Sequence, residues 1–214
     1  MLTHNVLPAA QGGKPDSLVV ILHGLGDSGE GIMGLGAAWR KALPTTEFIA
    51  PNAPFPCDMG GFGYQWFSVQ DRNPDVLFDG VKAAAPILNA TLDALSERLG
   101  LPFSRIALVG FSQGCMMSLY VAPRRAEALA GVIGYSGSLF GGESLTTERR
   151  SSPPFLLSHG MQDDVVPFAS LAKAESGLKA AGLAVETLAR PNLPHSIDDE
   201  GLEAGVAFLK KVFA

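Results

Sequence analysis

Short apolar runs alternate with helix-like patterns along most of the chain. Six runs are apolar at consecutive positions rather than at every second position, which is typical of strands buried on both faces. They are SLVVIL (17–22), TEFIA (46–50), RIALVG (105–110), GVIGYS (131–136), PFLLSH (154–159) and VETLA (185–189). We therefore predict six buried strands that together form a sheet.

The clearest helical pattern lies between residues 77 and 99. Apolar side chains recur there every three or four residues, and the pattern ends at Gly100, with Pro102 beyond it. Pro86 lies inside this segment and is a candidate kink. Further helices are predicted at 29–41, 113–122, 168–181 and 199–213. Alternating strands and helices predict an α/β fold: a mainly parallel central sheet with helices on both faces and a ligand site at the carboxyl ends of the strands.

One long irregular region, residues 51–76, interrupts this alternation. Loops of this length in compact domains are usually functional or disordered, and its aromatic residues argue against disorder. We predict a substrate pocket formed by Phe62, Trp66 and Phe67 from this region, with Met116 and Val165. The alternative is that several of these side chains fill the core, as most Trp and Phe do. With 214 residues and no repeat or linker, a single domain, 1–214, is expected.

Composition and charge exclude several classes of function. The apolar runs are far too short to span a membrane, and the first residues do not resemble a secretory signal, so we expect a cytoplasmic protein. A formal net charge of −5 without a basic run argues against nucleic acid as a partner. Cys57 and Cys115 lack ligand-like spacing, so we expect free thiols and no metal site.

The pentapeptide GFSQG, residues 110–114, joins a predicted strand to a predicted helix. In this setting the hydroxyl of Ser112 is exposed above the sheet, and Gly110 and Gly114 lie where a larger side chain would clash. A serine that merely caps the helix is the alternative, but it explains only the hydroxyl and not both glycines. Ser112 is therefore a candidate nucleophile.

A nucleophilic serine needs a base and an orienting acid. In hydrolases with this kind of turn the order along the chain is nucleophile, acid, base. Of the four histidines only His195 follows a candidate acid, whereas His23 and His159 each end a buried strand and are interpreted as structural. Asp163 and Asp164 both fall in the turn after the strand PFLLSH, and spacing does not separate them.

The glycine-rich segment HGLGDSGEG follows another buried strand. A backbone N–H there, which we assign to Leu25, and the N–H of Gln113 after the nucleophile are candidate donors to an oxyanion. The segment lacks the GKS or GKT ending of a P-loop and the GxGxxG spacing of a dinucleotide fold. We therefore expect no nucleotide cofactor.

Five motifs in order, HGLGDSG, PNAP, GLPFSRIALVGFSQG, HGMQDDVVP and LPHS, resemble the carboxylesterase, phospholipase and acyl-protein thioesterase family of small α/β-hydrolases. The resemblance implies the α/β-hydrolase fold, with Ser112 as nucleophile, Asp163 as acid and His195 as base. It also implies Leu25 and Gln113 as the oxyanion donors. Two positions depart from the family pattern: Cys115 replaces a glycine, and Met161 replaces an aspartate.

These residues predict a serine carboxylesterase that hydrolyses small to medium acyl esters through an acyl-enzyme intermediate. An acyl-protein thioesterase or a lysophospholipase on the same scaffold is the first alternative. A ligand-binding homologue without catalysis is the second, since fold does not decide function. The expected partner is a small-molecule ester, and a homodimer is an assembly that the sequence allows.

Overall fold

The computed structural model describes residues 2–214, and its centre is a seven-stranded sheet in the order β1-β3-β2-β6-β7-β8-β9. Edge strand β1 is antiparallel to β3, and the other neighbours are parallel. The strands are β1 His4–Leu7, β2 Ser17–Leu22, β3 Thr46–Pro51, β6 Ile106–Phe111, β7 Gly131–Tyr135, β8 Phe155–Gly160 and β9 Val185–Arg190. The parallel strands place their carboxyl ends at one edge of the sheet, where the predicted site residues follow.

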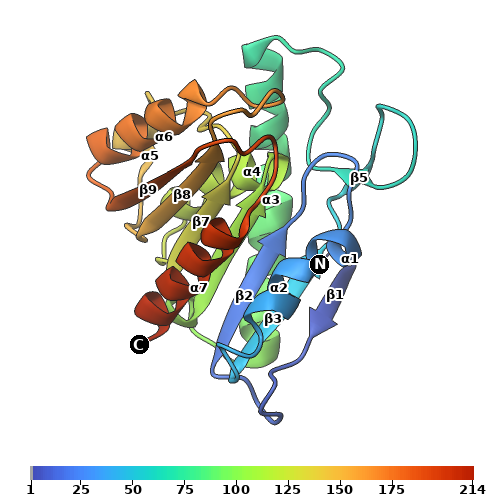
Figure 1. The fold of residues 1–214 in the computed structure, drawn as a ribbon, viewed down its shortest axis with the longest axis vertical. Helices are drawn as coiled ribbons and strands as arrows, with labels where there is room; N and C mark the ends of the chain where they lie inside the picture. The colour runs from blue at the N-terminus through green and yellow to red at the C-terminus, as the bar shows by residue number, and fades with distance from the viewer. Residues whose placement is uncertain (1) are drawn as a thin grey trace.

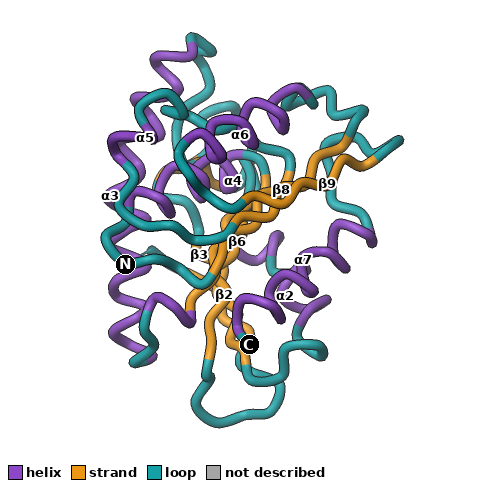
Figure 2. The backbone as a smooth tube through the Cα atoms, turned by 90° about the vertical axis from the view of Figure 1, so that its left-hand side faces the viewer, coloured by secondary structure: helices purple, strands orange, loops and turns teal. Residues whose placement is uncertain are grey.

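Helices cover both faces of this sheet (Figures 1 and 2). One layer contains α3 Pro74–Leu99, α4 Gln113–Val121, the short α5 Leu145–Glu148 and α6 Ala169–Ala180. The other contains α1 Gly29–Ile32, α2 Gly34–Trp39 and α7 Asp199–Phe213. Two 3₁₀ turns, Phe103–Arg105 and Ala122–Arg124, flank β6 and α4. Burial of apolar side chains on both sides of the strands stabilises this three-layer arrangement.

Alternate residues of each central strand pack into opposite layers. On β2, Val20 and Leu22 join the core beneath α3 and α4, whereas Val19 and Ile21 join the core beneath α2 and α7. This explains why the central strands are apolar at every position, because neither face of the strand meets water. The α/β fold with a mainly parallel sheet, predicted from the sequence, is confirmed.

The edges of the sheet differ from the prediction. Strand β1 was not predicted, because its four residues are only partly buried and carry little apolar pattern. Strand β9 was predicted to be buried on both faces, which is wrong: it is the opposite edge strand, and Glu186 and Thr187 on it are exposed. Two short strands, β4 Phe55–Pro56 and β5 Tyr64–Gln65, form a hairpin within the 51–76 region.

Two helix predictions also need correction. The predicted helix at 29–41 is two short helices that meet at Met33. Helix α3 begins at Pro74, with Asn73 as its N-cap, and continues through Pro86. Pro86 lies on the exposed side of α3, so water can solvate the carbonyl that loses its backbone hydrogen bond. Among residues 2–214, no helix combines the length and apolar character needed to cross a membrane.

Candidate active site

Ser112 occupies a strained turn between β6 and α4. Its backbone lies at φ 53° and ψ −115°, a conformation that residues other than glycine rarely adopt. The turn is held from both sides, since Ser112 N donates to Tyr135 O at 3.0 Å and Met116 N donates to Ser112 O at 3.0 Å. Strain that is maintained by surrounding hydrogen bonds is common at functional positions.

Gly110 and Gly114 allow this turn to form. A Cβ atom on Gly110 would collide with the Gly114 carbonyl, and a Cβ atom on Gly114 would collide with the Leu22 carbonyl. Strand β6, strand β2 and the start of α4 therefore approach more closely than any side chain would permit. This is the close packing that the flanking glycines predicted.

Cys115, which departs from the family pattern, fits because two other residues lack side chains. A Cβ atom on Gly134 would lie 2.6 Å from Cys115 Sγ, and one on Gly137 would lie 2.5 Å from the same sulfur. The thiol is buried, and burial raises its pKa to about 12. The departure from the pattern therefore leaves the packing of α4 intact.

His195 lies in the loop between β9 and α7 and is in contact with Asp163. Its Nδ1 donates to Asp163 Oδ2 at 2.8 Å, and the Phe111 ring packs against the imidazole with 4.8 Å between ring centres. Asp164 is exposed, so the structure distinguishes the two adjacent aspartates that spacing alone did not separate. With Nδ1 bonded to the carboxylate, Nε2 is the nitrogen left available to take a proton.

The Asp163 carboxylate is buried and surrounded by N–H groups. Its Oδ1 accepts hydrogen bonds from Val165 N at 2.9 Å and Val166 N at 2.8 Å. Burial by itself would raise the pKa of Asp163, but the hydrogen bonds from His195, Val166 and Val165 outweigh it and hold the pKa below its ordinary value. Asp163 is therefore ionised at neutral pH.

His159 also reaches this carboxylate, which sequence reasoning missed. Its Nε2 lies 2.9 Å from Val166 O and 3.2 Å from Asp163 Oδ2. We interpreted His159 as a structural residue that fixes the turn, and the bond to Val166 O agrees with that interpretation. His159 lies near the end of β8, four residues before Asp163 in the following turn, and this spacing was the only signal of the further contact.

A cavity of about 390 Å³ brings the predicted residues together. Ser112 and His195 line it, as do Leu25 and Gln113. Neither the Leu25 N–H nor the Gln113 N–H donates to another group among residues 2–214, so both can donate to a ligand. The cavity wall therefore combines a hydroxyl, an imidazole and two free backbone donors.

The remaining wall of the cavity is largely apolar. Phe67, Met116 and Val165, which the sequence assigned to a substrate pocket, line it. The structure adds residues that were not predicted: Val69, Leu77, Phe111, Phe140 and Val166, with the charged Asp27 and Arg72. Phe62 and Trp66 lie outside this wall. Phe62 is 97% exposed on the β4–β5 hairpin, and Trp66 is completely buried, so their assignment to this pocket is not supported by their positions.

Trp66 instead belongs to a buried polar network. Its indole Nε1 donates to His23 O at 3.0 Å, and its backbone N donates to Gln113 Oε1 at 3.0 Å. Gln113 Nε2 donates to Phe67 O at 2.8 Å, and Ala53 N donates to His23 Nε2 at 2.9 Å. The network thereby ties the 51–76 region to the glycine-rich loop and to the residue after the nucleophile.

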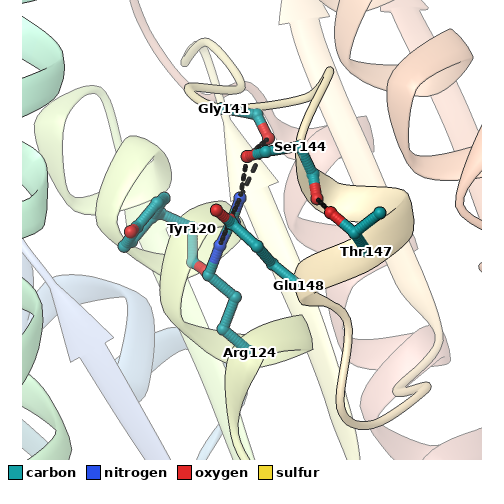
Figure 3. A network of polar contacts seen from close by, with 6 residues as sticks. All are labelled: Tyr120, Arg124, Gly141, Ser144, Thr147 and Glu148. Carbon is teal, nitrogen blue, oxygen red and sulfur yellow. Dashed lines mark hydrogen bonds and ion pairs between the residues drawn. The ribbon is translucent and has the colours of Figure 1, made fainter.

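Arg124 binds Gly141 and Ser144 in the segment between β7 and α5 (Figure 3). Its guanidinium donates to Gly141 O at 2.9 Å, pairs with Glu148 and stacks on the Tyr120 ring. Ser144 accepts a further bond from it at 3.4 Å. Phe140 precedes Gly141 directly and packs on the rings of Phe67 and Phe78. This polar network therefore anchors the segment next to Phe140, which lines the cavity.

Among the described residues, no group of three or more His, Cys, Asp or Glu side chains is arranged to hold a metal ion. Besides the charged Asp27 and Arg72, the cavity offers the Ser112 hydroxyl, the His195 imidazole and backbone N–H groups. With the buried Asp163 behind the imidazole, this set can activate an alcohol and stabilise an oxyanion.

Known proteins match this chain over nearly its whole length. The family model described as phospholipase/carboxylesterase matches residues 6–213. Acyl-protein thioesterase 1 of Schizosaccharomyces pombe is 32% identical, over 91% of this chain and 90% of the relative. A probable carboxylesterase of Oryza sativa subsp. japonica is 34% identical, over 94% of this chain and 80% of the relative. Esterase PE8, known from a crystal structure, is 39% identical in sequence, and the two structures superpose with a TM-score of 0.94 over 99% of both chains. The chain therefore belongs to the phospholipase/carboxylesterase family.

Proposed function

We propose that this protein is a serine carboxylesterase in which Ser112, His195 and Asp163 form the catalytic triad. Family membership and the esterase and carboxylesterase relatives make it a carboxylic ester hydrolase. One observation supports these residue roles. His195 Nδ1 lies 2.8 Å from Asp163 Oδ2, and His195 lines the same cavity as Ser112.

Each step of the reaction uses a group that lines the cavity. His195 Nε2 takes the Ser112 proton as Oγ attacks the ester carbonyl, and the N–H groups of Leu25 and Gln113 donate to the oxyanion. The intermediate expels the alcohol, which leaves with the proton from His195. A water molecule then attacks the acyl-enzyme while His195 takes its proton. Return of that proton to Ser112 releases the carboxylic acid.

The ionised Asp163 supports the imidazolium that forms in both steps. Its hydrogen bond fixes the His195 tautomer with Nδ1 protonated, so Nε2 faces the reaction as the base. Because His195 must be neutral to accept a proton, the rate is expected to fall at low pH. A rate that stays constant from about pH 8 to about pH 5 would contradict this role.

The apolar wall favours an acyl or alcohol group without charge, of small to medium size. A cavity of about 390 Å³ is within the range of small-molecule sites, ~300–1,000 Å³. The Schizosaccharomyces pombe relative is named an acyl-protein thioesterase, so hydrolysis of acyl thioesters is the second candidate function. Lysophospholipid hydrolysis would use the same groups.

A chain-length series of p-nitrophenyl esters, measured beside an acyl thioester, separates these substrates. We expect kcat/KM to peak at a short or medium acyl chain and to favour the oxygen ester. A maximum at the longest chains, or faster turnover of the thioester, would favour the thioesterase instead. Labelling by a fluorophosphonate probe tests catalysis itself, because a ligand-binding homologue without an activated serine would not react.

The compartment and the assembly are also proposals. Cys57 and Cys115 are free thiols, which is compatible with the reducing conditions of the cytoplasm. Fractionation of cells that produce the protein would test this location. A homodimer is proposed as the assembly, and the mass in solution tests it.

A further inference from the structure

We propose that His23 is a positioning residue for the oxyanion site: its ring holds the peptide group between Gly24 and Leu25 so that the Leu25 N–H faces the cavity. This inference rests on the proposed function, which assigns the Leu25 N–H to the oxyanion. It also gives a role to the PNAP segment, residues 51–54, which the reaction steps do not use.

The contacts of the His23 ring identify the nitrogen that carries its proton. The backbone N–H of Ala53 can only donate, and it lies 2.9 Å from Nε2, so Nε2 accepts this hydrogen bond and carries no proton. Nδ1 lies 2.6 Å from the carbonyl oxygen of Gly24, which can only accept, so Nδ1 is the donor. Both contacts therefore require the same neutral tautomer, and Ala53 of the PNAP segment helps to select it.

The His23 ring is neutral because it is buried. It has no exposed surface, and its centre lies 6.4 Å from that of the Tyr64 ring and 6.0 Å from that of the Trp66 ring. Burial lowers the pKa of His23 below its ordinary value, although the hydrogen bond to Gly24 O and the negative charge of Asp27 act in the opposite direction. Both ring contacts are therefore maintained at neutral pH.

The hydrogen bond from His23 determines the direction of the Leu25 N–H. The C=O of Gly24 and the N–H of Leu25 belong to one planar trans peptide group, in which the two bonds point in opposite directions. Because Nδ1 of His23 contacts the oxygen, the Leu25 N–H points away from the imidazole. Gly24 and Leu25 both line the cavity that contains Ser112, so this peptide group lies between the buried ring and the reaction site.

The same peptide group lies close to the nucleophile. A Cβ atom on Gly24 would lie 3.3 Å from Ser112 Cβ and 3.3 Å from the Phe111 ring. Among residues 2–214, the other hydrogen bond to Gly24 O comes from Asp27 N, at the longer distance of 3.4 Å. The His23 ring is therefore the principal contact that orients the peptide beside Ser112.

Two amide variants separate the two contacts of the ring. The amide of an asparagine reaches the position of Nδ1, so His23→Asn keeps a donor near Gly24 O and loses the acceptor for Ala53 N. The amide of a glutamine reaches the position of Nε2, so His23→Gln keeps the acceptor and loses the donor. If His23 only stabilised the fold, the two variants would have similar activity.

We expect the two variants to differ in kcat. Removal of an oxyanion donor lowers kcat by about 10²–10³-fold, and a donor that is present but misdirected should cause part of that loss. His23→Gln should lower kcat by about 10- to 100-fold, whereas His23→Asn should stay within about threefold of wild type. KM should change less than about threefold in both, because the oxyanion forms only in the transition state. Equal kcat values in the two folded variants would overturn the proposal.

A trifluoromethyl ketone measures the oxyanion site directly. Ser112 Oγ adds to the carbonyl carbon of the ketone, the serine proton passes to His195, and the carbonyl oxygen becomes an oxyanion without any group being expelled. Inhibition by the ketone should weaken in His23→Gln by about the same factor as kcat/KM. Inhibition that stays at the wild-type level while kcat/KM falls would contradict the role of His23.

Tyr135→Phe is the matched control. It removes another buried hydrogen bond, from Tyr135 Oη to Gly201 O at 2.9 Å, in the core beneath α2 and α7. It should lower thermal stability and leave both kcat and inhibition by the ketone unchanged. A loss in Tyr135→Phe as large as that in His23→Gln would show that lowered stability explains both.

NMR of the wild-type enzyme labelled with ¹⁵N-histidine tests the proposal even if His23→Gln does not fold. Nδ1 of His23 must carry the proton, and a protonated Nε2 would refute the proposal. When the ketone adduct forms, donation by the Leu25 N–H polarises the peptide and strengthens the hydrogen bond at Gly24 O, so the His23 Nδ1 proton should move downfield. An unchanged signal in the adduct would also refute it. If the proposed function itself is wrong, the ketone forms no adduct and Ser112→Ala keeps the esterase activity, whichever nitrogen of His23 is protonated.

Discussion

His195 Nδ1 lies 2.8 Å from Asp163 Oδ2, although the two residues are 32 positions apart in the chain. Strand β9 separates them in sequence, and β8 and β9 run parallel, so the loops after both strands emerge at the same edge of the sheet. Ser112 follows the parallel strand β6 at this same edge, and it lines the same cavity as His195. The topology of the sheet therefore creates a meeting point for three segments that are distant along the chain.

Removal of the Ser112 hydroxyl is expected to abolish turnover. Ser112→Ala should lower kcat/KM by about 10⁴-fold or more and prevent labelling by a fluorophosphonate probe, because no other group could form the acyl-enzyme. Ser118→Ala is a suitable control: this buried serine lies on the same helix and donates to Gly114 O. Substantial esterase activity in a folded Ser112→Ala variant would exclude the proposed nucleophile.

Asp163 is expected to contribute stability that depends on pH. Its pKa in the folded protein lies below the ordinary value of 3.8, so its contribution is complete above that pH and is lost as pH falls through the folded-state pKa. The difference in free energy of unfolding between wild type and Asp163→Asn should be largest near about pH 6 and should shrink toward about pH 2.5. Urea unfolding at both pH values measures it. Asp164→Asn, at the exposed neighbour, should show no such trend.

The two thiols are expected to differ in reactivity. Cys115 is buried and its pKa is raised to about 12, so almost none of it is thiolate at about pH 8. Cys57 is half-buried. A thiol reagent should titrate Cys57 in the native protein and both cysteines after denaturation. Rapid modification of Cys115 in the native state, identified by mass spectrometry, would show that α4 opens far more readily than its packing implies.

The fit between Cys115 and Gly134 can be tested by a double-mutant cycle. Gly134→Ala places a methyl group about 2.6 Å from Cys115 Sγ, so overpacking should cost about 1–3 kcal/mol in the free energy of unfolding. Cys115→Ala removes the sulfur and should recover much of this cost in the double variant. Additive effects of the two substitutions would mean that the sulfur is not the obstacle.

Arg124 is expected to influence substrate selection from outside the cavity. Arg124→Met removes the bonds to Gly141 and Glu148 and should lower the free energy of unfolding by about 2 kcal/mol. Since Phe140 precedes Gly141, KM should rise more for medium-chain esters than for acetate esters. Arg149→Met is the matched control, because the side chain of the exposed Arg149 donates to the nearby Ser152. An equal change in KM for esters of all chain lengths would show that Phe140 does not contact the acyl chain.

The pattern of apolar and polar residues along the chain was sufficient to predict the central strands and the helices that alternate with them. A strand buried on both faces must be apolar throughout, and a helix that covers a sheet must be apolar along one face, so both leave a local signal. The edge strands β1 and β9 carry weaker or misleading signals, because an edge strand meets water on part of its surface. Their places in the sheet depended on neighbours that are remote in sequence.

The sequence by itself also determined the candidate nucleophile and base, because Ser112 lies in a turn with two obligatory glycines and His195 is the only histidine after the acidic turn. Only the tertiary structure decided which side chains meet. It buried Asp163 beside His195 and His159, placed Phe140 on the cavity wall and left Phe62 in solvent and Trp66 in the core. The physical reason is that a turn, a cap or a buried run is specified by neighbouring residues, whereas a contact between loops depends on how the whole sheet aligns them.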